Sequence, residues 1–219
     1  MKKHPRYIPA FHFRWLTPWY DPMMRLLLPE EALKTALIAQ AHIQLGQDVL
    51  DVGCGTGTLT LLIKQTQPNA EVYGLDVDPQ VLDIARRKAE QAEETIVLQQ
   101  GTVTRLPYPG GTFERVFASL MLHHLTQEDK RLAIGEAFRV LKPGGELHVA
   151  DFCKPHDLSM WLISLVVRWV EEVHDNILGL LPVFMAEAGF CQVEETVRYR
   201  TVSGNLALYR ACKPTGEVL

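Results

Sequence analysis

The amino-acid sequence predicts an α/β protein built on a doubly wound, mostly parallel β-sheet. Short apolar runs alternate with stretches of helical periodicity throughout residues 48–152, and such alternation with right-handed crossovers produces parallel strands. The first run leads into glycines at three alternating positions, 53, 55 and 57. The last two runs are joined by a short connection around Ser203-Gly204. They should therefore pair antiparallel and leave one reversed strand near the C-terminal edge of the sheet.

The expected elements follow from periodicity and from start and stop signals. Strand-like runs cover residues 48–52, 71–76, 95–100, 114–119, 146–152, 191–200 and 205–212. Apolar residues recur at helical spacing over 59–63, 81–89 and 126–141, and residues 157–188 are mostly helical in pattern. Thr126 and Asp129 form a capping box at the start of the third helix, and Lys142-Pro143-Gly144-Gly145 ends it. We therefore expect residues 1–219 to form one domain, with residues 1–28 ahead of the sheet and a helical insertion at 157–188.

Composition excludes several other classes of protein. Hydrophobic residues make up 47% of the chain and charged residues 22%, which is the balance of a globular protein and not of a disordered, collagen-like or coiled-coil one. The net charge of −4 and the pI of about 6.1 argue against a nucleic-acid partner bound through its phosphates. Four cysteines without a CxxC pair predict neither a disulfide scaffold nor a metal site. With no signal-like or bilayer-spanning run identified, we expect a cytoplasmic location.

Residues 49–59 combine the features of a ligand-binding loop. A buried strand runs into the alternating glycines and then into a helix, so the backbone can turn sharply, approach a ligand and present free N–H donors. In open α/β sheets, ligands bind outside the carboxyl ends of the strands, where this loop falls. The second strand ends at Asp76, close to the spacing of about 20 residues at which an acidic side chain meets ribose hydroxyls. A dinucleotide site would need a glycine where Thr58 stands, and a tight turn without a ligand would not need three alternating glycines.

The pattern Gly-x-Gly-x-Gly, with Asp51 two residues ahead, resembles the S-adenosylmethionine (SAM) loop of class I methyltransferases. Four further segments resemble motifs of that family in the same order: residues 72–79, 106–116, 139–147 and 187–190. The likeness covers about residues 20–213, and it is greatest to the ubiquinone/menaquinone biosynthesis methyltransferases, with which Tyr20-Asp21 also agrees. The resemblance implies a Rossmann-like, seven-stranded sheet. It also implies an enzyme that uses SAM, releases S-adenosylhomocysteine, and methylates a small, apolar or lipid-like acceptor.

The resemblance also implies a set of cofactor-binding residues. These are Asp51, Gly53, Cys54, Gly55, Thr56, Gly57, Asp76, Val77, Thr102, Val103 and Ser119. Asp51 and the glycines would surround the methionine part of SAM, Asp76 would bind the ribose hydroxyls, and Val77 would contact the adenine. Thr102 stands where the family commonly has an aspartate that accepts a hydrogen bond from the adenine amino group. A hydroxyl accepts without charge assistance, so this bond should be weaker.

The candidate catalytic residues lie at the ends of the fourth and fifth strands. His123 or His124 could face the methyl group, and Asp151 could be a base, a substrate anchor or a simple cap. Either histidine could instead bond to the backbone at a helix entry. The expected substrate contacts are Tyr20, Met24, Trp161 and His174, the last in a polar patch with Asp175 and Asn176.

Two apolar segments, residues 11–28 and 158–176, contain those substrate contacts. We expect them to form a lid over the crevice, although the apolar residues nearly all round the second segment favour a core helix or a homodimer face for it. Residues 1–25 hold five basic residues interspersed with aromatic ones, which would also suit an anionic membrane surface.

Two other functions are open. A nicotinamide-dependent dehydrogenase is disfavoured by Thr58 and by the later motifs. A non-catalytic, SAM-binding regulatory protein is favoured slightly by Thr102. No Asn-Pro-Pro-Tyr signature follows the fourth strand, so we expect a small-molecule substrate and no nucleic acid.

Overall fold

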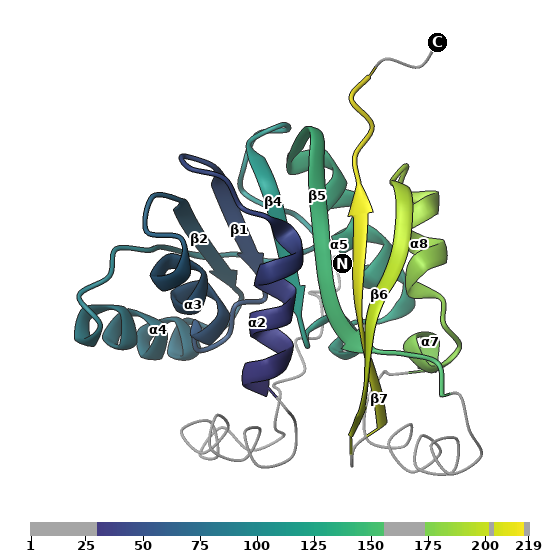
Figure 1. Cartoon of the computed structure of the whole chain (residues 1–219), viewed down its shortest axis with the longest axis horizontal. Helices are drawn as coiled ribbons and strands as arrows, with labels where there is room; N and C mark the ends of the chain where they lie inside the picture. Colours follow the sequence, from purple (N-terminus) through teal and green to yellow (C-terminus); the bar gives the residue numbers. More distant parts are fainter. Residues whose placement is uncertain (1–29, 156–173, 202–203, 217–219) are drawn as a thin grey trace, which may run out of the picture.

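The computed structural model describes residues 30–155, 174–201 and 204–216. Within these residues, seven strands form one sheet in the order β3-β2-β1-β4-β5-β7-β6 (Figure 1). The strands are β1 (Asp48–Val52), β2 (Glu71–Asp76), β3 (Val97–Gln100), β4 (Phe113–Ser119), β5 (Leu141–Phe152), β6 (Cys191–Thr201) and β7 (Gly204–Cys212). β7 runs antiparallel to both β5 and β6, and the other pairings are parallel. The predicted fold class is confirmed, with the reversed strand one position in from the edge.

Helices cover both faces of this sheet (Figure 1). α2 (Glu30–Ala41), α3 (Thr58–Thr66) and α4 (Pro79–Gln91) lie on one face, and α5 (Gln127–Val140) and α8 (Leu181–Glu187) lie on the other. The short η2 (Leu122–His124) and α7 (His174–Ile177) lie beside the carboxyl end of β5.

Each face of the sheet has its own apolar core. Neighbouring residues of a strand point to opposite faces, and Val49 and Leu50 are both fully buried, in different clusters. Val49 packs with residues of α2 and α3, whereas Leu50 packs in the cluster that includes α5 and α8. Burial on both faces explains why apolar residues stand next to each other in a strand, as Val49 and Leu50 do in β1.

The structure differs from the sequence-based expectation most at the start of β5 and at α2. β5 begins at Leu141 and not at residue 146, because Leu141 pairs with Phe113 and the Gly144 N–H donates to the Lys213 carbonyl at 2.9 Å. The segment that ends α5 is therefore already part of the ladder. α2 was not expected as an element, although its buried side chains, which include Leu33, Leu37 and Ala41, recur at helical spacing. Thr126 caps α5 as predicted, accepting the Asp129 N–H at 3.2 Å.

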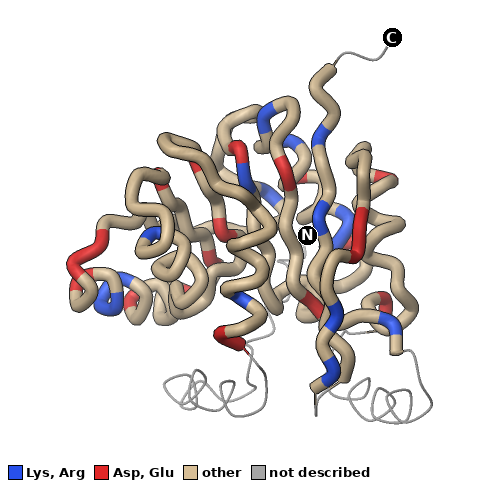
Figure 2. Tube along the Cα trace, in the orientation of Figure 1, with Lys and Arg blue, Asp and Glu red and all other residues tan. Residues whose placement is uncertain are grey.

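Charge is distributed without a strong bias over the part of the chain that the structure describes. Figure 2 shows basic and acidic residues interspersed along the trace. No helix within the described residues is both long enough and apolar enough to pass through a bilayer.

Candidate active site

The loop between β1 and α3 has the backbone conformation that its glycines predict. Gly53, Gly55 and Gly57 have φ values of 66°, 53° and 72°, in the left-handed region that side chains disfavour. A Cβ atom on Gly57 would lie 2.7 Å from that of Ala85, and one on Gly53 would lie 3.0 Å from that of Met121. A Cβ atom on Gly55 would meet no described atom within 4 Å. The loop is thus packed closely at two glycines and open at the third, where a ligand can approach the backbone.

Asp76, at the end of β2, is tied to this loop. Its Oδ2 accepts a hydrogen bond of 2.9 Å from the Gly55 N–H, and its Oδ1 accepts one of 3.0 Å from the Asp78 N–H. Burial raises the pKa of Asp76, against the effect of these backbone donors. An ionised carboxylate can accept about four hydrogen bonds, so Asp76 retains capacity for two hydroxyl donors.

Asp51, on β1, lies directly below the loop and is 1% exposed. Burial raises its pKa from 3.8 to about 7, although the Thr60 hydroxyl donates to its Oδ2 at 2.7 Å and the charge of Lys34 acts in the opposite direction. A cationic ligand would stabilise the ionised form of this carboxylate, because a nearby positive charge favours ionisation.

Ser119 ends β4, the strand next to β1 in the sheet. Its hydroxyl is buried and has no hydrogen-bond partner in the described protein, which costs about 1–3 kcal/mol unless a ligand or water satisfies it. Leu120, which follows it, has a φ of 53°, and its N–H donates to the Ala150 carbonyl at 2.8 Å. A left-handed leucine marks a strained turn, and such turns often occur at functional sites.

Three other predicted cofactor residues, Cys54, Thr56 and Val77, have different surroundings. Burial raises the pKa of the Cys54 thiol well above 9, so this side chain is a neutral packing group. The Thr56 hydroxyl accepts a hydrogen bond of 2.9 Å from Lys88 of α4, which ties it to the helix layer. Val77, just beyond Asp76, is 39% exposed. It can therefore provide an apolar surface for a flat ring.

Thr102 and Val103 lie just after β3. The Thr102 hydroxyl lies 2.9 Å from that of Thr104 and accepts a hydrogen bond of 3.4 Å from the Thr104 N–H, so both of these bonds stay within its own loop. Val103 packs against the core of the α5 face. These contacts neither require nor prevent the adenine contact predicted for Thr102.

A histidine–aspartate pair lies where β4 and β5 end. His123 Nδ1 is 2.8 Å from Asp151 Oδ1, and both residues are buried. Asp151 also accepts hydrogen bonds from the backbone N–H groups of Leu122, His123 and Phe152 and from the side-chain amide of Asn176, at 2.7–3.3 Å. This set of donors holds the carboxylate, and through it the imidazole, in one orientation.

Electrostatics distinguish the two histidines. Burial alone would raise the pKa of Asp151, but the charge and hydrogen bond of His123 outweigh it, and the pKa lies below its usual value. An ionised Asp151 can only accept, so the neutral form of His123 carries its proton on Nδ1, and Nε2 is the nitrogen that gains or loses the second proton. Burial and the neighbouring His123 lower the pKa of His124 to about 3. His124 therefore stays neutral and is a weak base.

The predicted polar patch on α7 contributes a residue other than the expected one. His174 is exposed, whereas Asn176 is 1% exposed and donates to Asp151 Oδ1 at 3.0 Å. The Asn176 Oδ1 atom is buried without a partner in the described protein. Asp175 anchors α7 by accepting from Lys130 at 3.2 Å and from Gln127 at 3.0 Å. The sequence offered only a weak signal for Asn176, its place in a polar patch within an apolar stretch.

Tyr20, Met24 and Trp161, expected to contact the substrate, lie outside the described residues. Among the residues that are described, no group of three or more His, Cys, Asp or Glu side chains could hold a metal ion.

Comparison with known proteins agrees with this geometry. The family described as "Methyltransferase domain" matches residues 49–145, from β1 into the start of β5. A demethylmenaquinone methyltransferase of Thermus thermophilus is 36% identical over 156 residues, which is 70% of each chain. The chain belongs to the class I S-adenosylmethionine-dependent methyltransferases. SAM is accordingly its cofactor, and a methyltransferase is favoured over both the dehydrogenase and the non-catalytic regulatory protein.

Two further comparisons extend this identification. A demethylmenaquinone methyltransferase of Deinococcus radiodurans is 34% identical over 145 residues, or 65% of this methyltransferase and 59% of that relative. The YcgJ protein of Bacillus subtilis superposes with a TM-score of 0.70 over 85% of this chain and 100% of that one, at 17% identity. This second likeness concerns the fold.

The residues present fit the cofactor of the methyltransferase family. The open side of Gly55, the remaining acceptor capacity of Asp76 and the unsatisfied hydroxyl of Ser119 all lie at the carboxyl ends of neighbouring strands. The buried Asp51 adds a carboxylate that favours a cationic ligand.

Proposed function

We propose that this methyltransferase methylates a small, ring-bearing acceptor of the quinone type, with His123 as the general base. The names of the relatives support the acceptor class, since two of them are demethylmenaquinone methyltransferases. The His123–Asp151 pair, 2.8 Å apart, is the observation that carries the assignment of the base.

Methyl transfer from SAM requires little chemistry from the protein itself. When bound, SAM supplies a methyl group that is already activated on a sulfonium. Asp51, Gly55, Asp76 and Ser119 would hold it at the strand ends. The remaining requirement is an aligned acceptor, and a base only where that acceptor must lose a proton. A hydroxyl on an aromatic ring is such an acceptor, because its deprotonation makes the ring carbons and the oxygen more nucleophilic.

His123 meets the requirements of this base. Asp151 fixes its tautomer and stabilises the imidazolium that forms when Nε2 takes the proton. Asp151 itself acts as a positioning residue, because its donors already occupy it. His124, with a pKa of about 3, is too weak a base for a phenol-like hydroxyl.

Asn176 completes the proposed acceptor site. Its amide nitrogen is committed to Asp151, so its buried Oδ1 is the atom that can accept from a substrate hydroxyl. Cytoplasmic location, contact with a membrane surface, homodimerisation and a lid formed by residues 11–28 and 158–176 stay predictions.

The test is a turnover assay with SAM labelled in its methyl group. The acceptors are a reduced demethylnaphthoquinone with a short side chain and, as controls, its O-methylated form and an ethanolamine phosphate. We expect methyl transfer to the reduced quinone alone. His123→Gln should lower turnover by about 10²–10⁴-fold without changing the dissociation constant of SAM, because it removes a general base.

His124→Gln is the matched control, and it should retain turnover within about threefold, because a weak base contributes little proton transfer. Loss of turnover in His124→Gln, with His123→Gln active, would reverse the assignment of the base. Tight SAM binding without transfer to any acceptor would favour the regulatory alternative.

A further inference from the structure

Cys191 and Cys212 lie directly opposite each other on the last two strands. Their Cα atoms are partners in the antiparallel β6–β7 ladder, and the Cys191 thiol donates to the Cys212 carbonyl with an Sγ–O distance of 3.2 Å. Side chains of opposed residues stand on the same face, with Cα atoms about 4.5–5.5 Å apart. This separation lies inside the range of about 4.4–6.8 Å that a disulfide bridges.

A β-bulge creates this pairing. The register of the ladder shifts between Cys191 and Glu194, and Gln192 inside the shift has a φ of 50°. In the register of Glu194 with Arg210, Cys191 would face Lys213 and not Cys212. Gln192 prefers a negative φ, and its positive φ is strained. The packing of the sheet edge overrides this backbone preference, and the result is that the two thiols come together.

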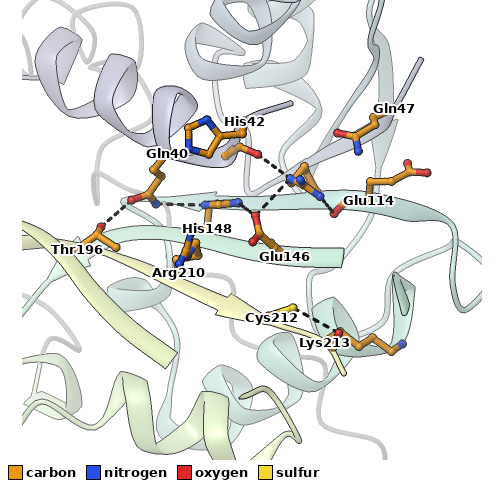
Figure 3. A network of polar contacts seen from close by, with 12 residues as sticks. Gln40, His42, Gln47, Glu114, Glu146, His148, Thr196, Arg210, Cys212 and Lys213 are labelled. Carbon is orange, nitrogen blue, oxygen red and sulfur yellow. Dashed lines mark hydrogen bonds and ion pairs between the residues drawn. The ribbon is translucent and has the colours of Figure 1, made fainter. Parts of the chain in front are cut away.

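The two thiols differ in access. Cys191 is exposed on β6, the edge strand, whereas Cys212 is half-buried and Cys54 and Cys153 are buried. Burial and the adjacent Cys191 raise the pKa of Cys212, and its thiol donates weakly to the Lys213 carbonyl at 3.5 Å (Figure 3). Cys191 is therefore the thiol that an oxidant meets first.

The pair is remote from the active site. Cys212 pairs with Glu146 in the middle of β5, whereas Asp151 pairs with Ala207 five residues further along, at the carboxyl end of that strand. A change at the cysteines can thus alter the sheet edge without touching the residues proposed to bind SAM.

We propose that Cys191 and Cys212 form a reversible disulfide that fastens the edge strand β6 to β7, with a low-molecular-weight disulfide as the oxidant. The Cys191 thiolate attacks one sulfur of that disulfide, which expels one small thiol and leaves a mixed disulfide on Cys191. The Cys212 thiolate then attacks the Cys191 sulfur and expels the second small thiol. The protein loses two protons and two electrons, and the oxidant is reduced to two thiols.

The experiment compares the full chain after incubation with oxidised glutathione and with dithiothreitol. Free thiols are then alkylated, and intact mass and tryptic peptides are measured. We expect the oxidised protein to lose two hydrogen atoms and to yield a linked pair of peptides, residues 169–198 and 211–219. The link should raise the melting temperature by roughly 5–10 °C, because it restricts the unfolded chain.

Variants make the assignment specific. Cys191→Ser and Cys212→Ser should each abolish the link and the shift in melting temperature, whereas Cys153→Ala should retain both. SAM affinity should be the same in the oxidised and the reduced protein. Glutathione adducts without an internal link, a link through Cys54 or Cys153, or an unchanged melting temperature would overturn the proposal.

Discussion

The hydroxyl of Thr60 donates a hydrogen bond of 2.7 Å to Oδ2 of Asp51, a carboxyl group that is fully enclosed beneath the glycine loop. Burial raises the pKa of Asp51 from 3.8 to about 7. Between these two values the folded protein holds a proton that the unfolded chain has released. Asp51 therefore lowers the free energy of unfolding progressively as the pH rises from 3.8 to about 7, and it has little effect below that window.

Asp51→Asn should remove this penalty, because an amide stays neutral and its oxygen can still accept from Thr60. We expect the free energy of unfolding to rise by roughly 1–3 kcal/mol at pH 8 and to change little at about pH 4. Denaturant titration at the two pH values measures the difference. An equal change at both would show that the charge of Asp51 is not the cause.

The same substitution should weaken SAM binding at least about tenfold, because it removes a carboxylate that we place near the cationic methionine part of SAM. In the unmodified protein, the affinity should fall as the pH decreases below about 7, where Asp51 becomes protonated. Calorimetry across this pH range is the measurement. A variant with the affinity and pH profile of the original protein would place Asp51 away from the cofactor.

Asp76→Ala should also weaken SAM binding at least about tenfold, since two charge-assisted hydrogen bonds to the ribose would contribute about 1.5–3 kcal/mol each. It should lower stability as well, because the N–H groups of Gly55 and Asp78 lose their acceptor. Asp78→Ala is the matched control: it removes the α4 cap, and its effect should appear in stability and not in affinity. Unchanged SAM binding in Asp76→Ala would contradict the assignment.

Much of this fold could be predicted from sequence, because local signals and tertiary packing agree. In β1 the adjacent apolar residues Val49 and Leu50 indicate a strand buried on both faces, and the Thr126 cap marks the start of α5 without reference to the rest of the chain. The start of β5 was missed because Leu141 is extended by its pairing with Phe113, a distant partner. Proline and glycine normally end an element, and here the ladder overrides that preference.

The active site was predictable only in part. The glycine loop and Asp76 follow from spacing along one strand–helix–strand unit. The choice of His123 over His124 depends on Asp151, 28 residues away, and on the burial that lowers the pKa of His124. Asn176 reaches the pair because α7 folds back onto the end of β5. Such contacts between distant segments leave no periodic pattern in the sequence.

The anchor of α7 supports a prediction about stability. Lys130 is fully buried and donates to Asp175 Oδ2 at 3.2 Å. Asp175→Ala should cost roughly 3–5 kcal/mol, because it weakens the compensation of a buried charge. Lys130→Met combined with Asp175→Ala should cost less than Asp175→Ala alone, since both charges are then absent. A double-mutant cycle by denaturant unfolding checks this; additive losses would mean that the two residues do not interact.

His148 lies at the centre of a buried polar network between α2 and the sheet (Figure 3). Its Nδ1 is 3.2 Å from Gln40 Nε2, its Nε2 is 3.2 Å from Glu146 Oε2, and its ring stacks on Phe117 with centroids 5.2 Å apart. The Gln40 amide can only donate at this nitrogen, so the neutral ring carries its proton on Nε2, toward Glu146. Burial lowers the pKa of His148, although Glu146 acts to raise it.

A lowered pKa in the folded state makes His148 a source of acid sensitivity. Above its unfolded value of 6.5, His148 is neutral in both states and contributes nothing. As the pH falls below 6.5, the unfolded chain takes up a proton that the folded protein resists, so stability is lost by up to about 1.4 kcal/mol per pH unit. His148→Phe should remove this loss and change stability little at pH 7.5, because Phe can stack on Phe117 and Gln40 keeps its bonds to Tyr209 and Thr196.

Free energies of unfolding measured between pH 7.5 and 5 test this expectation. The difference between His148→Phe and the unmodified protein should grow in favour of the variant as the pH falls. Asp51 titrates in the same range with the opposite sign, but it is present in both proteins and cancels from the difference. His174→Gln, at an exposed histidine, is the matched control and should run parallel to the unmodified protein. If the free energy of unfolding of His148→Phe also ran parallel to that of the unmodified protein, the His148 ring would be taking up its proton inside the fold, with Glu146 as its counter-ion.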